Sequence, residues 1–358
     1  MQHMQAHTAR QHKRAAARGL LLLFLFDILL AGFIVGGDYL VNYRIPHRLS
    51  ALNASTTDVQ TLPLPVTGSG QQSAGDTTAS GSSDWGQKFQ DKFSDTVVST
   101  DTVYKSPNIS VEITQPSYDS ETIDLTSNGK HSKYGTQIYY TLADIYVRDI
   151  SCLRTSFAQD TYGVGFYETL SSMSERMKSI LAVNGDSYSN NRHYNNGTII
   201  RNGIVYRAQP TTDGTCVLFR DGTMKIYGPD GLDPNQLIAD GAWQSWVFGP
   251  SLLDAEGNAK TDFLTWDYIR ESHPRTAIGY YEPGHYCLLV VDGRQPGLSR
   301  GMFLEEMSQL FADLGCKAAY NLDGGHCAFM TRDANVISKP YRPSKDISDG
   351  IFICEPEA

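Results

Sequence analysis

The pattern of apolar and polar positions divides the chain into three parts. Residues 19–36 form an apolar run interrupted only by Asp27, and a helix of that length spans about 27 Å, enough to cross a bilayer core. Residues 50–96 are mostly Ser, Thr, Gly and Gln, which bury too little apolar surface to fold. Short apolar runs separated by turn residues follow. We therefore predict a basic cytoplasmic tail at 1–18, a transmembrane signal anchor at 19–41, a flexible linker at 42–100 and one folded domain at 101–358.

Within the folded part, the apolar pattern predicts more strands than helices. Three hairpins are expected where apolar runs flank Asn202-Gly203, Asp221-Gly222 and Pro283-Gly284. Hairpins dominate and crossovers between parallel strands are few, so we expect an α+β fold with a mixed, largely antiparallel sheet and packed helices. Helices are expected near residues 168–178, 234–240 and 304–314, and a short amphipathic helix containing Trp85, Phe89 and Phe93 is expected to dock on the domain.

The charge distribution predicts the orientation of the chain and excludes one class of partner. The first 48 residues carry six basic and two acidic side chains, a formal +4 of the total −9, which leaves −13 for residues 49–358. Basic residues before the apolar run place the N-terminus in the cytoplasm and the C-terminal domain outside the cell membrane. Gly36-Gly37-Asp38 is a poor cleavage site, which disfavours the alternative, a cleaved signal peptide. An acidic domain argues against nucleic-acid binding.

Six cysteines show neither a CxxC pair nor the dense spacing of a disulfide scaffold. Some of them could pair outside the membrane, and the sequence does not indicate which. Asp27 is either functional, for example by pairing with a partner helix, or a single tolerated charge.

Residues 275–330 hold the densest set of candidate functional groups. Asp292-Gly293 and Asp323-Gly324 each follow an apolar run and flank the helix expected at 304–314. A glycine after each aspartate tolerates a positive φ and lets a ligand approach the backbone closely. The same stretch contains Arg275, Arg294 and Glu305. This density indicates a site rather than two ordinary turns.

The motifs in this stretch resemble those of the phosphodiester glycosidase family. The resemblance covers roughly residues 105–354 and implies a glycosidase that cleaves N-acetylglucosamine-1-phosphodiester-like linkages; bacterial relatives are commonly labelled exopolysaccharide biosynthesis proteins. The matching segments are Arg275–Gly279, Asp292–Arg294, Ser299, Gly301-Met302, Leu304–Glu306, Leu314–Cys316 and Asn321–Gly325, with Ala182–Asp186 and Arg201–Gly203 upstream and Ile347–Ile351 near the end.

The chain departs from the family pattern directly after Gly325. The family usually has a small or polar residue and then Ser, whereas this chain has His326, Cys327 and Ala328. His326 could act as an acid or a phosphate contact, because its unperturbed pKa lies near neutrality, or it could be a loop residue with no role. For Cys327 we favour a buried apolar thiol over a nucleophile.

The implied reaction assigns roles to the residues that match. Cleavage at the anomeric carbon needs a carboxylate at the sugar, as nucleophile or general base, and cationic groups on the phosphate. The candidate carboxylates are Asp323, Asp292, Glu305 and Asp186. The candidate substrate contacts are Arg275, Thr276, Arg294, Asn184, Gly185, Gly293, Ser299, Gly301, Asn321, Gly324, Gly325 and His326. We expect no cofactor; a divalent cation held by clustered carboxylates is the alternative.

Two other functions remain open. A non-catalytic carbohydrate-binding or assembly protein for exopolysaccharide or cell-wall glycopolymer would keep the pocket and lose turnover, and the change at 326–328 favours it. A phosphodiesterase cutting on the phosphorus side would need a metal or a strong nucleophile. Structural roles are also open: Arg275 could pair with Asp292 or Asp323, and Glu305 could favour a helix N-terminus. The sequence does not give the sugar, the stereochemical outcome or the oligomeric state.

Overall fold

The computed structural model describes residues 2–43, 45–52, 85–120, 134–187, 196–212, 214–229, 232–263, 265, 267–343 and 345–356. The chain divides into two units, residues 1–48 with 163–165, and residues 49–162 with 166–358. The first unit contains helix α1 (Gln2–Tyr43) and the strand pair β1 (His47–Arg48) and β8 (Gly163–Val164). Residues Arg18–Val41 of α1 are apolar and exposed, with the length and composition of a membrane span or a signal sequence.

Residues 85–100, which the sequence assigned to the linker, contribute to the fold of the second unit. Helix α2 (Trp85–Lys88) is followed by β2 (Val98–Ser99). Trp85 and Phe89 are 5% and 8% exposed and pack in the main core, with Phe93 against it. These large aromatic side chains bury enough apolar surface to dock the segment, although the residues around them are mostly polar. The folded unit therefore begins before the predicted boundary at Asp101, while most of the predicted linker, residues 53–84, lies outside the described residues.

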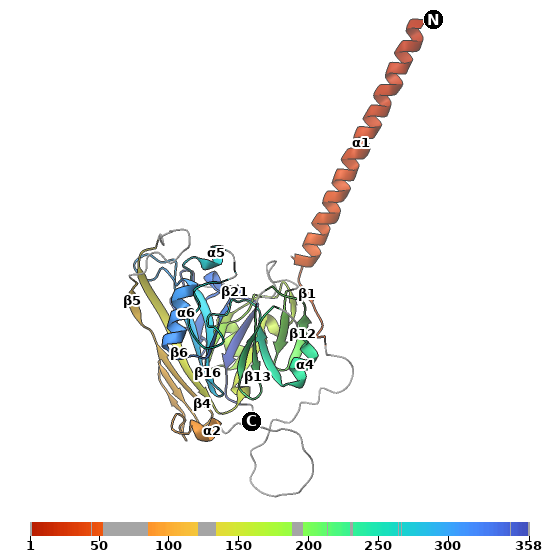
Figure 1. The fold of residues 1–358 in the computed structure, drawn as a ribbon. Coiled ribbons are helices and arrows are strands. Elements are labelled where there is room, and N and C mark those ends of the chain that lie inside the picture. Colours follow the sequence, from red (N-terminus) through yellow and green to blue (C-terminus); the bar gives the residue numbers. More distant parts are fainter. Residues whose placement is uncertain are drawn as a thin grey trace, which may run out of the picture. The chain divides into compact units, whose positions relative to one another are not determined.

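The second unit is built around an eight-stranded sheet in the order β18-β16-β17-β6-β4-β3-β2, with β5 paired to β6 (Figure 1). Every strand pairing in the described part of the chain is antiparallel, as the hairpin-rich sequence predicts. The remaining strands are β3 (Val103–Lys105), β4 (Ile109–Thr114), β5 (Ser117–Asp119), β6 (Gln137–Val147), β16 (Arg275–Glu282), β17 (His285–Val291) and β18 (Ala318–Leu322).

A five-stranded sheet packs against one face of this sheet. Its order is β20-β19-β10-β22-β7, and its apolar residues Leu181, Val183 and Ile351 share a core with Ile278, Leu288 and Val290 of the larger sheet. The strands are β7 (Leu153–Phe157), β10 (Leu181–Asn184), β19 (Met330–Arg332), β20 (Asn335–Val336) and β22 (Asp349–Ile353). Helix α3 (Leu170–Met177) covers the outer face of the small sheet through Leu170 and Met173.

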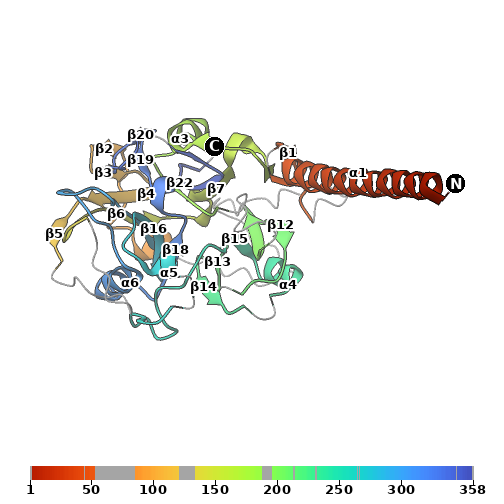
Figure 2. The ribbon, with the colours of Figure 1, turned by 90° about the horizontal axis from the view of Figure 1, so that it is seen from above.

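Helix α6 (Leu304–Asp313) covers the other face of the eight-stranded sheet (Figure 2). Its core stripe of Leu304, Met307 and Phe311 packs on alternate residues of β16 and β17, as the 3.6-residue period predicts. The layers are thus α6, the large sheet, the small sheet and α3. This arrangement confirms the expected α+β class with largely antiparallel sheets and packed helices.

Smaller elements complete the unit. The three predicted hairpins are present. They are β11 (Thr198–Arg201) with β12 (Ile204–Ala208), β13 (Thr215–Phe219) with β14 (Met224–Tyr227), and β16 with β17; β15 (Ala242–Trp246) joins β13 on its other side. Two short helices, α4 (Pro234–Ala239) and α5 (Asp267–Arg270), and the strand pair β9 (Glu168–Thr169) and β21 (Asp346–Ile347) lie in connections. None of the six cysteines, all of which lie in described segments, forms a disulfide, and the buried Sγ atoms of Cys287 and Cys316 lie 3.9 Å apart.

Candidate functional site

Sheet topology brings the family motifs together at one edge of the large sheet. Strand β16 begins at Arg275, and its antiparallel neighbours β17 and β18 end beside it, with Arg275 opposite Val291 and Thr276 opposite Leu322. The two Asp-Gly steps therefore leave the sheet on either side of Arg275. Strand β10 ends nearby, because the Asp323 N–H donates to the Gly185 carbonyl at 3.1 Å.

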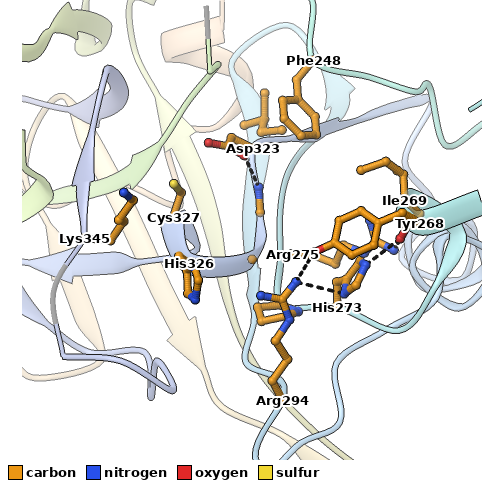
Figure 3. A pocket seen from close by; sticks show the side chains of 14 residues that line it. Phe248, Tyr268, Ile269, His273, Arg275, Arg294, Asp323, His326, Cys327 and Lys345 are labelled. Carbon is orange, nitrogen blue, oxygen red and sulfur yellow. Dashed lines mark hydrogen bonds between the residues drawn. The ribbon is translucent and has the colours of Figure 1, made fainter. Parts of the chain in front are cut away.

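A pocket of about 270 Å³ lies at this edge (Figure 3). Six of the predicted site residues line it: Arg275, Arg294, Asp323, Gly324, Gly325 and His326. Eight further residues complete the lining: Phe248, Tyr268, Ile269, His273, Pro274, Leu322, Cys327 and Lys345. The pocket therefore combines one carboxylate, Asp323, with the basic side chains of Arg275, Arg294 and Lys345 and an aromatic wall.

The backbone of Asp323 is held by the end of β10. The Asn184 side-chain amide donates to the Asp323 carbonyl at 2.6 Å, and the Thr276 hydroxyl donates to Asn184 Oδ1 at 2.7 Å. Asn184 and Thr276 are 1% and 0% exposed, so they position the pocket rather than line it. The Asp323 carboxylate accepts from the Gly324 N–H at 2.9 Å. A buried network thus fixes the backbone from which this carboxylate projects.

Arg294 is held in the pocket by neutral partners. Its Nη1 donates to the Tyr341 hydroxyl at 2.7 Å. Its Nη2 donates to the Tyr268 hydroxyl at 2.8 Å and to His273 Nδ1 at 3.2 Å (Figure 3). Burial, together with the charges of Arg275 and Arg294, lowers the pKa of His273 to about 3, so the imidazole is neutral and accepts this bond. These contacts orient the guanidinium without neutralising it, which leaves its charge available to an anion.

Arg275 is buried under the pocket floor and bonds to main-chain carbonyls. Its Nε donates to Met302 O at 3.1 Å, and its Nη2 donates to Ile269 O at 2.6 Å and Glu271 O at 2.7 Å. Burial lowers its pKa to about 9, which still leaves it protonated at neutral pH. Arg275 therefore fixes the loop that carries Tyr268 and His273, and adds a second positive charge beneath the pocket.

The glycines of the two Asp-Gly steps are needed for close packing. A Cβ on Gly293 or Gly324 would lie 2.8 Å or 2.7 Å from the backbone of Pro274. The positive φ expected at these glycines occurs one residue later, at Arg294 (φ 59°) and Gly325 (φ 66°). Gly301 also packs against the backbone, at His273, with φ 95°. The prediction that these two glycines supply the positive φ of a turn is therefore corrected. They are small because the two strand ends pack closely against Pro274, just before β16.

Asp292 lies outside the pocket lining and is 1% exposed. Its Oδ2 accepts from the Lys339 N–H at 2.9 Å, while its Oδ1 is buried without a partner in the described structure. The Ser299 hydroxyl donates to the Asp292 carbonyl at 2.5 Å and accepts from the Tyr139 N–H, which explains a buried serine at that position. Burial raises the pKa of Asp292 to about 7.

This raised pKa predicts a pH-dependent stability. A carboxyl whose folded pKa lies above its unfolded value of about 3.9 stabilises the fold at low pH, and this contribution is lost as the pH rises through 7. We expect Asp292→Asn to reduce the loss of stability between pH 5 and pH 8 by about 3 kcal/mol. Urea unfolding of the full-length protein at both pH values measures it, with the exposed Asp346→Asn as the control. Parallel pH curves for wild type and Asp292→Asn would contradict the assignment.

Asp186 is also buried away from the pocket lining. It accepts from the backbone N–H groups of Val247 (2.9 Å) and Phe248 (3.0 Å), and it lies 3.5 Å from Arg201, which also binds Asp349. Burial raises the pKa of both carboxylates, and Arg201 opposes this shift. Since Phe248 lines the pocket, Asp186 supports the pocket wall. Asp186 therefore lies behind the pocket wall, whereas the candidate carboxylate Asp323 lines the pocket.

Glu305 lies in the first turn of α6, beneath rather than in the pocket lining. Its Oε1 is 3.8 Å from Arg270, its Oε2 is buried without a partner among the described residues, and burial raises its pKa. Of the other expected substrate contacts, Asn321 is fully buried and donates to the Gly249 carbonyl at 2.7 Å. Gly185 leaves room for the Asp349 side chain.

Sequence reasoning missed the aromatic and cationic residues that enclose the pocket from the short helix α5 and from connections between strands. Tyr268, His273 and Lys345 belong to no recognised motif, and Phe248 and Tyr341 follow segments without strong periodicity. The sequence did offer one signal for His273 and Pro274. They directly precede the Arg275 motif, and residues next to the end of a strand lie at the same edge of the sheet as that end. Among the described residues, no group of three or more His, Cys, Asp or Glu side chains is placed to hold a metal ion.

One of the comparisons with known proteins names a family. Residues 177–354 match the family model for phosphodiester glycosidases. Over 194 residues, 53% of this chain, the sequence is 34% identical to the SPbeta prophage-derived uncharacterized protein YomE of Bacillus subtilis (strain 168). That match spans 29% of the Bacillus protein, so the chain corresponds to less than a third of this relative.

Two solved structures share the fold. The catalytic domain of zebrafish N-acetylglucosamine-1-phosphodiester alpha-N-acetylglucosaminidase, auto-inhibited by its pro-peptide, aligns with a TM-score of 0.53 and 19% identity, covering 70% of this chain and 90% of that one. A hypothetical protein from Synechocystis aligns with a TM-score of 0.50 and 13% identity, covering 71% and 64%. At these identities the alignments show the fold alone.

Proposed function

Because its matched domain places this chain in the phosphodiester glycosidase family, we propose that it hydrolyses sugar-1-phosphodiester linkages, of the N-acetylglucosamine-1-phosphodiester type, in a surface polysaccharide or glycoconjugate. The observation that carries the proposal is that a carboxylate and a guanidinium line the same pocket. Asp323 supplies a carboxylate, and Arg294 supplies a guanidinium whose partners are all neutral.

The reaction needs these two groups on opposite sides of the scissile bond. As the bond between the anomeric carbon and the phosphate oxygen breaks, positive charge develops on the sugar and negative charge on the leaving phosphate. In our proposal Asp323 faces the sugar, as nucleophile or as general base for water. Arg294 binds the phosphate through hydrogen bonds, and Arg275 adds positive potential from beneath.

A phosphate leaving group reduces the demand for a second, acidic carboxyl. Asp292, Glu305 and Asp186 lie outside the pocket lining, so we assign them to positioning rather than to proton transfer. Asp186 holds Phe248, Asp292 holds the segment at Lys339, and Glu305 lies near Arg270. Asn184 and Thr276 position Asp323.

The altered segment after Gly325 favours one alternative, a carbohydrate-binding or assembly protein without turnover. Cys327 lines the pocket close to Asp323, and burial together with the Asp323 charge raises the pKa of this thiol strongly. A neutral thiol there does not serve as a nucleophile. We therefore assign Cys327 to the pocket wall, and turnover decides between enzyme and binding protein.

The N-terminal apolar helix suggests where the reaction takes place. With basic residues before Arg18–Val41 and an acidic domain after it, the proposed arrangement is a single-pass cell-membrane protein with its catalytic domain outside. A surface glycopolymer would then lie within reach of the pocket.

Hydrolysis by the full-length protein in detergent micelles tests the proposal. We expect free sugar to be released from N-acetylglucosamine-1-phosphodiesters, and not from the matching alkyl glycosides. Arg294→Gln removes charged hydrogen bonds to phosphate, so kcat/KM should fall by about 100-fold. Arg148→Gln, at an exposed arginine outside the pocket lining, is the control. Saturable binding of the diesters without turnover would favour the binding-protein alternative.

A further inference from the structure

His326 stands where the family pattern has a small or polar residue, and its surroundings are cationic. Its ring stacks on Tyr341, with centroids 4.8 Å apart. His326, Arg294 and Lys345 line the same pocket. Burial lowers the pKa of His326, and the charges of Arg342, Arg294 and Lys345 lower it further. Figure 3 shows His326, Cys327 and Lys345 along one side of the pocket.

The three cations lack acidic partners in the described part of the chain. The ion pairs among the described residues involve other basic side chains, and none of these pairs includes Arg294, Arg342 or Lys345. Asp323 and Lys345 line the same pocket, and the charges of both act on the Cys327 thiol. A positive cluster of this kind is unexpected in a region with a formal charge of −13. It creates a local potential that attracts anions.

The cluster extends beyond the space of one phosphate. Arg294 lines the pocket, whereas Arg342 lies outside the lining and is exposed, with its guanidinium carbon 5.8 Å from the centre of the Tyr341 ring. The same ring lies 5.4 Å from the guanidinium carbon of Arg294 on the pocket side. Tyr341, which stacks on His326, therefore lies next to both Arg294 and Arg342.

We propose that His326, Arg342 and Lys345 form a second anion subsite, which binds an anionic group of the substrate next to the phosphate that is cleaved. The substrate is then a repeating anionic glycopolymer rather than an isolated diester. The second anion is a further phosphate in a polyphosphodiester chain, or the carboxylate of an acidic sugar. This inference rests on the proposed function in one point only, namely that the anion bound in the pocket is the phosphate of the linkage that is cleaved.

Calorimetric binding to the full-length protein in detergent micelles tests the subsite without turnover. The probes are the monophosphates and bisphosphates of propane-1,3-diol and pentane-1,5-diol, which cover two spacings, and the corresponding phosphate–carboxylate compounds. We expect the better-fitting bisphosphate to bind about tenfold more tightly than its monophosphate. The double variant Arg342→Gln/Lys345→Gln should lose most of this gain, while Arg342→Lys and the exposed, remote Lys317→Gln should keep it.

The outcomes separate the two proposals. Equal affinities for monophosphate and bisphosphate at both spacings, or a gain that survives the double variant, would overturn the second subsite, whether or not sugar diesters are hydrolysed. A gain that depends on Arg342 and Lys345 supports the subsite even if hydrolysis fails. Tight binding of the phosphate–carboxylate probe would identify an acidic sugar as the source, and tight binding of the bisphosphate alone would identify a phosphate chain.

Discussion

Replacing Asp323 by Asn should lower kcat on a sugar-1-phosphodiester by about 10³-fold. The substitution keeps the size of the side chain and retains an oxygen that can accept from the Gly324 N–H. It removes the negative charge and the basicity on which attack at the anomeric carbon depends. The backbone bonds from Asn184 and to Gly185 do not involve the side chain, so the fold should be preserved.

Initial-rate kinetics on purified full-length protein, with thermal unfolding as a check of folding, measure this effect. Asp313→Asn, at an exposed carboxylate on α6, is the matched control and should behave as wild type. A folded Asp323→Asn protein that keeps more than about a tenth of the wild-type kcat would show that Asp323 is not the carboxylate at the sugar.

Replacing Arg201 by Met should destabilise the domain by about 3–5 kcal/mol. Arg201 is 2% exposed and binds both Asp186 and Asp349, which are 3% and 1% exposed. Without the guanidinium, two buried carboxylates would face each other uncompensated. Since burial already raises the pKa of both, each would take up a proton or leave the core.

The pH dependence identifies this mechanism. A carboxyl with a raised folded pKa stabilises the fold at low pH and loses that contribution as the pH rises, so the defect of Arg201→Met should be smaller at pH 5 than at pH 8. Urea unfolding followed by the fluorescence of Trp243 and Trp246 measures it. The triple variant Arg201→Met/Asp186→Asn/Asp349→Asn, which removes all three charges, should recover much of the loss. A defect independent of pH, or below about 1 kcal/mol, would contradict this account of the cluster.

Much of the fold could be predicted from local signals. The Asn202-Gly203 and Asp221-Gly222 turns and the apolar stripe of α6 each determine structure within one hairpin or one helix, and all three are present. The docking of Trp85 was predicted, but the start of the domain was not. Trp85 and Phe89 lie at the end of a polar stretch, and their burial depends on partners far away in the sequence.

The site was predictable only in part, for a similar reason. Asp323 and Arg294 were identified because each belongs to a motif at a strand end. Nothing in the sequence shows that Asp292 points into a dry interior while Asp323 lines a pocket, since both precede a glycine after an apolar run. Tyr268 reaches the pocket from the short helix α5 and Lys345 from a connection, so their contribution depends on tertiary structure that no local pattern encodes.

The position of bond cleavage tests the central proposal most directly. Hydrolysis of a sugar-1-phosphodiester in ¹⁸O-water by the full-length protein, followed by mass spectrometry of both products, shows which atom the water attacks. A glycosidase that attacks the anomeric carbon places ¹⁸O in the released sugar and leaves the phosphate monoester unlabelled, and this is the result that we expect. Label in the phosphate would show attack at phosphorus and would contradict the proposed reaction.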